Sequence, residues 1–193
     1  MLVVFTTQIT LQKRSCSMPN WCYNTLELRL LNKDIRDAFK LSLENEVLFQ
    51  FLCPLDLGYG DDGKPLWNYD VANNKWGTKW DVSSLHYTYD DVEETFYLNF
   101  DTAWCPPEAF YYSLMENDDV DFIRATYIEN GMEFLGQYIN DCGTLTNEQY
   151  SYDDIIPYDL GQEVGLDDYS DEPMFELNTD GDSYIRIEQK DEV

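Results

Sequence analysis

The motif WGTKWD at residues 76–81 combines two tryptophans with one cation and one carboxylate. Residues of these types can line an aromatic pocket in which Lys79 and Asp81 orient a polar ligand. Trp76 and Trp80 are also four residues apart, the spacing at which two aromatic side chains pack on one side of a helix. Both interpretations stay open, and packing is favoured because aromatic pairs at helical spacing usually belong to a core.

A second motif, FDTAWCPP at residues 100–107, follows the strongest strand pattern in the chain. Its aromatic and acidic residues extend the ligand hypothesis, while Thr102 can instead cap a helix that begins at the two prolines. The cap is favoured because every helix N-terminus needs such partners. The candidate ligand-binding residues of the two motifs are Trp76, Lys79, Trp80, Asp81, Asp101 and Trp104.

Cys105 is the one candidate nucleophile, because helix N-termini depress thiol pKa values. Its only possible histidine partner is His86, and a pair without an orienting third group is weak evidence for catalysis. The sequence contains no closely spaced zinc ligands, phosphate-binding glycine loop or serine-hydrolase motif. We therefore predict no catalytic residues, no metal and no cofactor. An enzymatic role stays open, and a non-enzymatic role is favoured.

The chain is strongly acidic, with a formal net charge of -26 over 193 residues. Residues 101–193 contain 24 Asp and Glu residues against 3 Lys and Arg residues. Such a charge repels nucleic acid and anionic membranes, so the expected partner is a basic host protein, with no direct nucleic acid or membrane contact. Acidic clusters are usually solvated surface. The candidate partner-binding residues are Asp153, Asp154, Asp167, Asp168, Asp171 and Glu172.

Hydrophobic patterning predicts an α+β domain over residues 18–140. Capping and turn residues separate its strands and helices. The order of elements favours a ferredoxin-like split βαβ sheet with helices on one face. The expected strands cover residues 22–31, 82–89, 95–100, 121–129 and 132–140, and the expected helices cover residues 34–46 and begin at Pro106.

The two ends of the chain fall outside this pattern. Residues 1–17 form an expected N-terminal extension, which makes Met18 an alternative start to Met1. Residues 141–193 are expected to be an acidic C-terminal region, loosely packed apart from a late hairpin around Asp180 and Gly181. The sequence does not decide whether this region packs on the domain, nor does it give the oligomeric state.

The sequence predicts a cytoplasmic protein. No stretch approaches the roughly 20 apolar residues that cross a bilayer. Lys13 and Arg14 follow the short apolar start instead of preceding it, which is the wrong order for a secretory signal. The five cysteines are odd in number and widely spaced, so free thiols are expected in a reducing compartment.

Three motifs together carry a resemblance to a known family. They are MPNWCYNTL at residues 18–26, WGTKWD and FDTAWCPP, with ENGMEF at residues 129–134 fitting the same pattern. Over residues 18–140 the chain resembles the YubB-type family of phage and plasmid proteins. That resemblance implies a ferredoxin-like domain and a mobile-element setting, but no activity and no catalytic residues.

Three function classes follow from these observations. The first is an acidic interaction protein of a phage or plasmid that binds a basic, possibly nucleic-acid-handling, host protein. The second is a small-molecule-binding protein or enzyme that uses the WGTKWD and TAW region. The third is a structural accessory protein without a pocket. The charge of the second half of the chain favours the first class.

Overall fold

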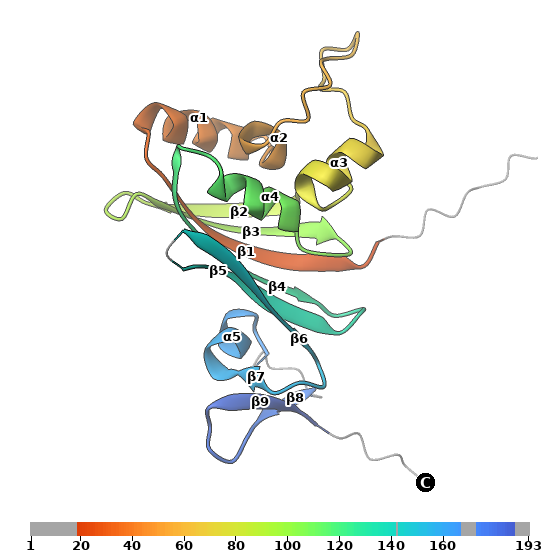
Figure 1. The fold of residues 1–193 in the computed structure, drawn as a ribbon, viewed down its shortest axis with the longest axis vertical. Helices are drawn as coiled ribbons and strands as arrows, with labels where there is room; N and C mark the ends of the chain where they lie inside the picture. Colours follow the sequence, from red (N-terminus) through yellow and green to blue (C-terminus); the bar gives the residue numbers. More distant parts are fainter. Residues whose placement is uncertain (1–18, 142, 167–172, 188–193) are drawn as a thin grey trace, which may run out of the picture.

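The computed structural model describes residues 19–141, 143–166 and 173–187. Its centre is a six-stranded antiparallel sheet in the order β2-β3-β1-β4-β5-β6, with helices α1 to α4 on one side (Figure 1). The opposite side is partly covered by helix α5 and a small sheet in the order β7-β9-β8. The strands of the large sheet are β1 Trp21–Leu30, β2 Ser83–Asp90, β3 Thr95–Ala103, β4 Val120–Glu129, β5 Phe134–Asp141 and β6 Thr144–Ser151.

The helix side of the sheet holds the main hydrophobic core. Along β1 the residues alternate, so that Leu26 and Leu28 are buried beneath the helices while Thr25 and Glu27 lie on the other face. This alternation confirms the strand expected at residues 22–31. The helices on this side are α1 Lys33–Leu43, α2 Phe49–Leu52, α3 Tyr69–Trp76 and α4 Glu108–Met115.

Polar contacts fix the first helices to the sheet. The Asn32 side chain accepts a hydrogen bond from the backbone N–H of Asp34 and so caps α1. The buried Arg36 guanidinium donates to the carbonyl of Leu30 at 2.7 Å and pairs with Glu94 at 2.6 Å. The cation thereby satisfies backbone acceptors where β1 passes into α1.

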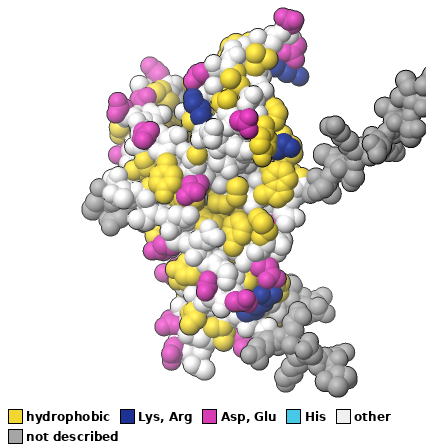
Figure 2. Space-filling view, turned by 45° about the vertical axis from the view of Figure 1, so that its right-hand side comes forward, with side chains coloured by type: hydrophobic (Ala, Val, Ile, Leu, Met, Phe, Trp, Pro, Cys, Tyr) yellow, Lys and Arg dark blue, Asp and Glu magenta, His cyan; other side chains and the backbone are white. Residues whose placement is uncertain are grey.

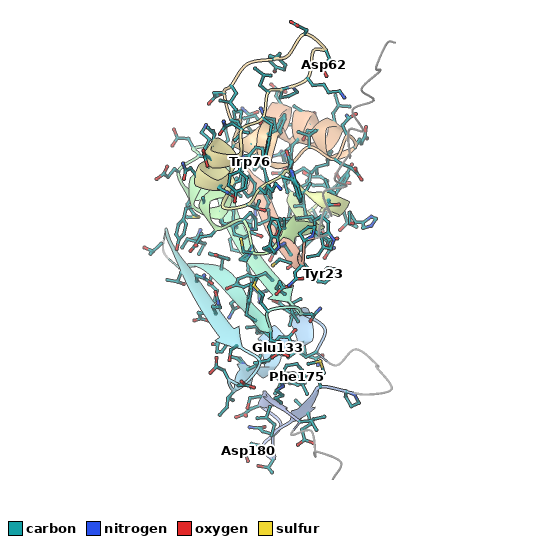
Figure 3. All side chains as sticks on the ribbon, turned by 90° about the vertical axis from the view of Figure 1, so that its right-hand side faces the viewer. Tyr23, Asp62, Trp76, Glu133, Phe175 and Asp180 are labelled. Carbon is teal, nitrogen blue, oxygen red and sulfur yellow. The ribbon has the colours of Figure 1, made fainter. Side chains whose placement is uncertain are left out.

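The C-terminal part of the chain has a core of its own. Residues of α5 Tyr158–Glu163 and of strands β7 Ile156–Pro157, β8 Phe175–Leu177 and β9 Ser183–Arg186 pack against Leu135 of β5. Arg186 donates two hydrogen bonds to Glu133, at 2.8 and 2.9 Å, which ties β9 to the turn between β4 and β5. In Figure 3, Glu133 and Phe175 lie below the level of Tyr23 and Trp76.

The prediction of a ferredoxin-like split βαβ sheet with helices on one face and an acidic extension is wrong. The large sheet has six strands, continues past residue 140 into β6, and is accompanied by a second sheet of three strands. The prediction of loose packing beyond residue 141 is also wrong for the described residues there, because they form strands and a buried cluster. The late hairpin is confirmed, with β8 and β9 paired across Asp180 and Gly181.

Gly161 sets how closely α5 approaches the small sheet. A Cβ atom at this position would collide with the ring of Tyr184, which packs directly against the helix backbone. We therefore expect Gly161→Ala to lower the free energy of unfolding by about 1–3 kcal/mol through overpacking. Chemical denaturation measures the loss, and the exposed Asp159→Ala on the same helix is its control. Equal stability of the two variants would contradict the close packing of α5.

Candidate functional site

Lys79, Trp80 and Trp104 form one exposed cluster. The Nζ atom of Lys79 lies 4.2 Å from the ring centroid of Trp80 and 5.7 Å from that of Trp104. The two indole rings are stacked at 6.2 Å with an angle of 26° between their planes. Although they contact each other, Trp80 stays 36% exposed and Trp104 38% exposed. The cation therefore holds two large apolar rings together at the surface.

Two further aromatic residues extend this cluster. The indole N–H of Trp67 donates to the carbonyl oxygen of Lys79 at 2.9 Å, and the rings of Trp67 and Tyr69 meet edge to face at 6.5 Å. Both side chains are about half exposed. We call Trp67, Tyr69, Lys79, Trp80 and Trp104 the tryptophan patch. Sequence reasoning missed its first two members, although the available signal was two aromatic residues within residues 54–75, a segment rich in turn-forming residues.

The backbone around Trp104 is strained. Trp104 has a φ of 67°, a left-handed conformation that is rare for a large side chain. Its backbone N–H donates to the carbonyl of Asn20 at 2.9 Å, which fixes the turn after β3 beside the start of β1. This turn brings Trp104 to Trp80, so strain is held at the place where the two rings meet.

Trp76 and Asp81, the other two residues of the first motif, have structural roles. Trp76 is buried, and its indole N–H donates to the carbonyl of Cys53 at 2.8 Å. The Asp81 carboxylate accepts hydrogen bonds from the backbone N–H groups of Phe49 at 2.9 Å and Gln50 at 3.0 Å. It thus caps α2 from a distant part of the chain. Burial raises the pKa of Asp81, and these backbone hydrogen bonds oppose the shift.

Asp101 lies away from the tryptophan patch. It faces the side of the sheet opposite to α1 to α4, where Tyr23 is its partner in the register of β1 and β3. Burial raises the pKa of Asp101, while a hydrogen bond from Ser84 and the charge of His86 lower it. The structure therefore brings Lys79, Trp80 and Trp104 together and places Asp101 in a separate groove.

Cys105 does not meet His86. The thiol lies 3.3 Å from the carbonyl oxygen of Gly77, beside α4, whereas His86 lines the groove on the opposite face of the sheet. Burial is the main cause that raises the pKa of the Cys105 thiol. A thiol with a raised pKa is a poor nucleophile, and among the described residues the contacts of Cys105 are with backbone carbonyl oxygens, as expected of a packed side chain.

The six acidic candidate residues fall into two groups. Two of them contact other residues of the chain, and four lie outside the described residues. Asp153 pairs with Arg186 at 3.0 Å, and the Asp154 carboxylate accepts from the backbone N–H of Ser151 at 2.7 Å. These two side chains therefore stabilise local structure. The other four, Asp167, Asp168, Asp171 and Glu172, lie outside the described residues.

Most of the positive charge in the described part of the chain is already paired. Ion pairs of 2.6–3.2 Å join each described arginine to a carboxylate. Lys33 and Lys75 are paired as well, and Lys40 lies 3.5 Å from the ring centroid of Tyr89. On the face shown in Figure 2, acidic side chains lie scattered between hydrophobic ones. A net charge of -26 with neutralised cations produces a negative field around the protein.

Comparison with models of known families, with curated proteins and with solved structures gives no match. The resemblance to the YubB-type family thus stays a prediction. Over the residues that the structure describes, no helix combines the length and the apolar character needed to cross a bilayer.

Proposed function

We propose that this protein is a non-enzymatic binding protein that docks a basic partner protein through the tryptophan patch. The observation that carries the proposal is the exposure of Trp80 and Trp104 around Lys79 within a chain of net charge -26. Exposed tryptophans contribute most to binding when they lie at the centre of an interface. The surrounding negative field favours basic partners and speeds their approach.

The architecture of the patch supports a protein ligand over a small one. Interfaces typically have an aromatic centre and a polar rim, and the patch places three tryptophans and a tyrosine on one surface. Lys79, Trp80 and Trp104 lie outside the hollows on the far face of the sheet and beside α4, as far as the described residues form them. An exposed surface of four aromatic rings suits the side chains of another protein.

We further propose that this protein belongs to a phage or plasmid and acts in the cytoplasm of its host. The motif resemblance supports the mobile-element part. The free thiols of Cys22, Cys53 and Cys105 support a reducing compartment. A partner that normally holds nucleic acid would present the basic surface that this charge favours.

The double variant Trp80→Ala and Trp104→Ala should lose partner binding at least about 30-fold, since central tryptophans commonly contribute 2 kcal/mol or more. The measurement is quantitative capture from bacterial lysate by the tagged protein, with captured proteins identified by mass spectrometry. Tyr112→Ala is the matched control, because this tyrosine is 43% exposed on α4 and lies outside the patch. Circular dichroism checks that each variant is folded. A captured set that is the same for wild type and the double variant would overturn the proposal.

A further inference from the structure

The two edge strands of the large sheet are built differently. Strand β2 at one edge has an irregular register with β3 between Ser83 and His86, and Ser84 in this stretch has a φ of 51°. A bulge of this kind hinders an edge from pairing with another strand. Strand β6 at the other edge pairs with β5 in one continuous register over all of its eight residues. Of the two edges of this sheet, β6 is therefore the regular one.

The outer edge of β6 presents backbone polar groups at alternate residues. Directly after the strand, the backbone N–H of Tyr152 donates to the carbonyl of Glu133 at 3.0 Å, which continues the ladder with β5. Because backbone groups alternate in direction along a strand, the even-numbered residues of β6 face β5. The N–H and C=O groups of Leu145, Asn147 and Gln149 consequently point away from β5. These groups can form hydrogen bonds with a further strand.

Strand β6 lacks the residues that commonly prevent edge pairing. Its sequence TLTNEQYS contains no lysine, arginine or proline, and Glu148 is its one charged residue. Because residues 101–193 contain 24 Asp and Glu residues in all, a strand with a single carboxylate is locally almost neutral. On the helix side, Asn147 and Gln149 line an open hollow of about 610 Å³ between β6 and α4. The helix therefore leaves space beside this edge.

A second copy of the same strand fits this edge in an antiparallel register. With Asn147 opposite Asn147 of the second copy, Leu145 lies opposite Gln149, and the outward-pointing groups meet one another across a two-fold axis. This register also places Glu148 opposite Thr146 of the second copy. A register with Asn147 opposite Gln149 would set the two Glu148 carboxylates directly against each other, which is destabilising. The opposite shift would leave fewer residues of β6 paired, so charge and length select the first register.

We propose that this chain forms a homodimer in which β6 pairs with β6 of a second copy and joins two six-stranded sheets into one. A basic segment suits this edge less well, because β6 offers it a single carboxylate. The net charge of each copy opposes association, and salt screens this repulsion. The dimer should therefore tighten as salt rises, which is the opposite of the salt dependence expected for the tryptophan patch. Strand β6 contains no residue of that patch, so failure of the dimer would leave the proposed docking surface untouched.

Sedimentation velocity of the full chain over a range of concentrations measures the dissociation constant of the dimer. Thr146→Glu places a carboxylate opposite Glu148 of the second copy at two symmetric positions, and should weaken the dimer about tenfold. Thr146→Lys places a cation there and should tighten the dimer about threefold. The controls are Thr88→Glu and Thr88→Lys, which make the same charge changes at an exposed residue of β2 and should stay within about twofold of wild type. Circular dichroism checks that every variant is folded.

Hydrogen exchange of the full chain gives a second readout. The amides of Asn147 and Gln149 should be protected at concentrations where the chain is dimeric and lose this protection on dilution, whereas those of Thr146 and Glu148 should stay protected. A chain that is monomeric at every concentration and salt would leave this edge to a strand of another protein and overturn the proposal. A dimer that responds equally to the changes at Thr146 and Thr88 would have another interface, and this result would overturn it as well.

Discussion

Replacing Phe49 with alanine should lower the free energy of unfolding by about 3–5 kcal/mol, the cost of truncating a fully buried aromatic side chain. Phe49 is completely inaccessible, and its ring centroid lies 4.5 Å from that of Phe110, 5.6 Å from Trp76 and 5.9 Å from Phe100. The ring thus joins α2, α3, α4 and β3. Surrounding rings of this size cannot collapse into the space that alanine leaves.

Guanidinium denaturation of the full chain measures this loss. The control is Val92→Ala, because Val92 is 91% exposed in the turn between β2 and β3 and should change stability by less than about 0.5 kcal/mol. A loss below about 1 kcal/mol for Phe49→Ala would show that the helix layer does not pack around this ring. The effect matters for the patch, because α2 and α3 position the segment that carries Lys79 and Trp80.

Asp81→Ala should cost about 2–3 kcal/mol, more than a typical cap. Its carboxylate accepts from the backbone N–H groups of Phe49, Gln50 and Val82 at 2.9–3.0 Å, with Leu48 at 3.3 Å. Alanine would leave these donors without a protein acceptor. Asp81→Asn retains one acceptor oxygen and should lose less. Thermal unfolding measures both variants, and equal stability of Asp81→Ala and wild type would contradict the capping role.

The contribution of Asp81 should also depend on pH. Burial raises its pKa in the folded chain above the ordinary value, so the folded state holds this proton more tightly than the unfolded state does. Stability from this group is then greatest in acid and falls as pH rises through the interval between the unfolded and the folded pKa. The stability difference between wild type and Asp81→Ala should therefore be larger at about pH 4 than at pH 7. A difference that grows towards neutral pH would mean that ionisation of Asp81 favours folding.

The strands of the first part of the chain are predictable because their patterns are local. Alternation of Leu26, Leu28 and Leu30 with polar residues is decisive for β1, since one face is buried and the other is open. The sequence reading missed α3, because residues 54–75 contain strong turn signals and the asparagine cap at Asn68 resembles another loop residue.

The last strand of the large sheet could not be predicted from its amino-acid composition. Strand β6 is an edge strand with the sequence TLTNEQYS, and most of its side chains are exposed, so it carries little hydrophobic pattern. The C-terminal core is assembled from residues as far apart as Leu135 and Tyr184. Any short stretch of the C-terminal sequence contains only isolated apolar residues among acidic ones. The sequence therefore led to the wrong prediction of a loosely packed extension.

The candidate site could be predicted only in part from the sequence. Neighbours in sequence, such as Lys79 and Trp80, stay together in space. Asp81 was grouped with them as a ligand residue, although its partners at Phe49 and Gln50 lie about thirty positions away and only the fold reveals them. Asp101 was separated from Trp104 by strand geometry, since β3 directs it to the opposite face of the sheet from the helices.

The most direct test of the central claim is the salt dependence of partner capture by wild type and by the patch variant. At about 0.1 M salt, wild type should retain a basic protein that the Trp80→Ala and Trp104→Ala variant loses, and this protein should dissociate as salt rises towards about 0.5 M. A captured partner that is acidic, that stays bound to the variant, or that is unaffected by salt would contradict the account of an acidic protein docking through its tryptophan patch.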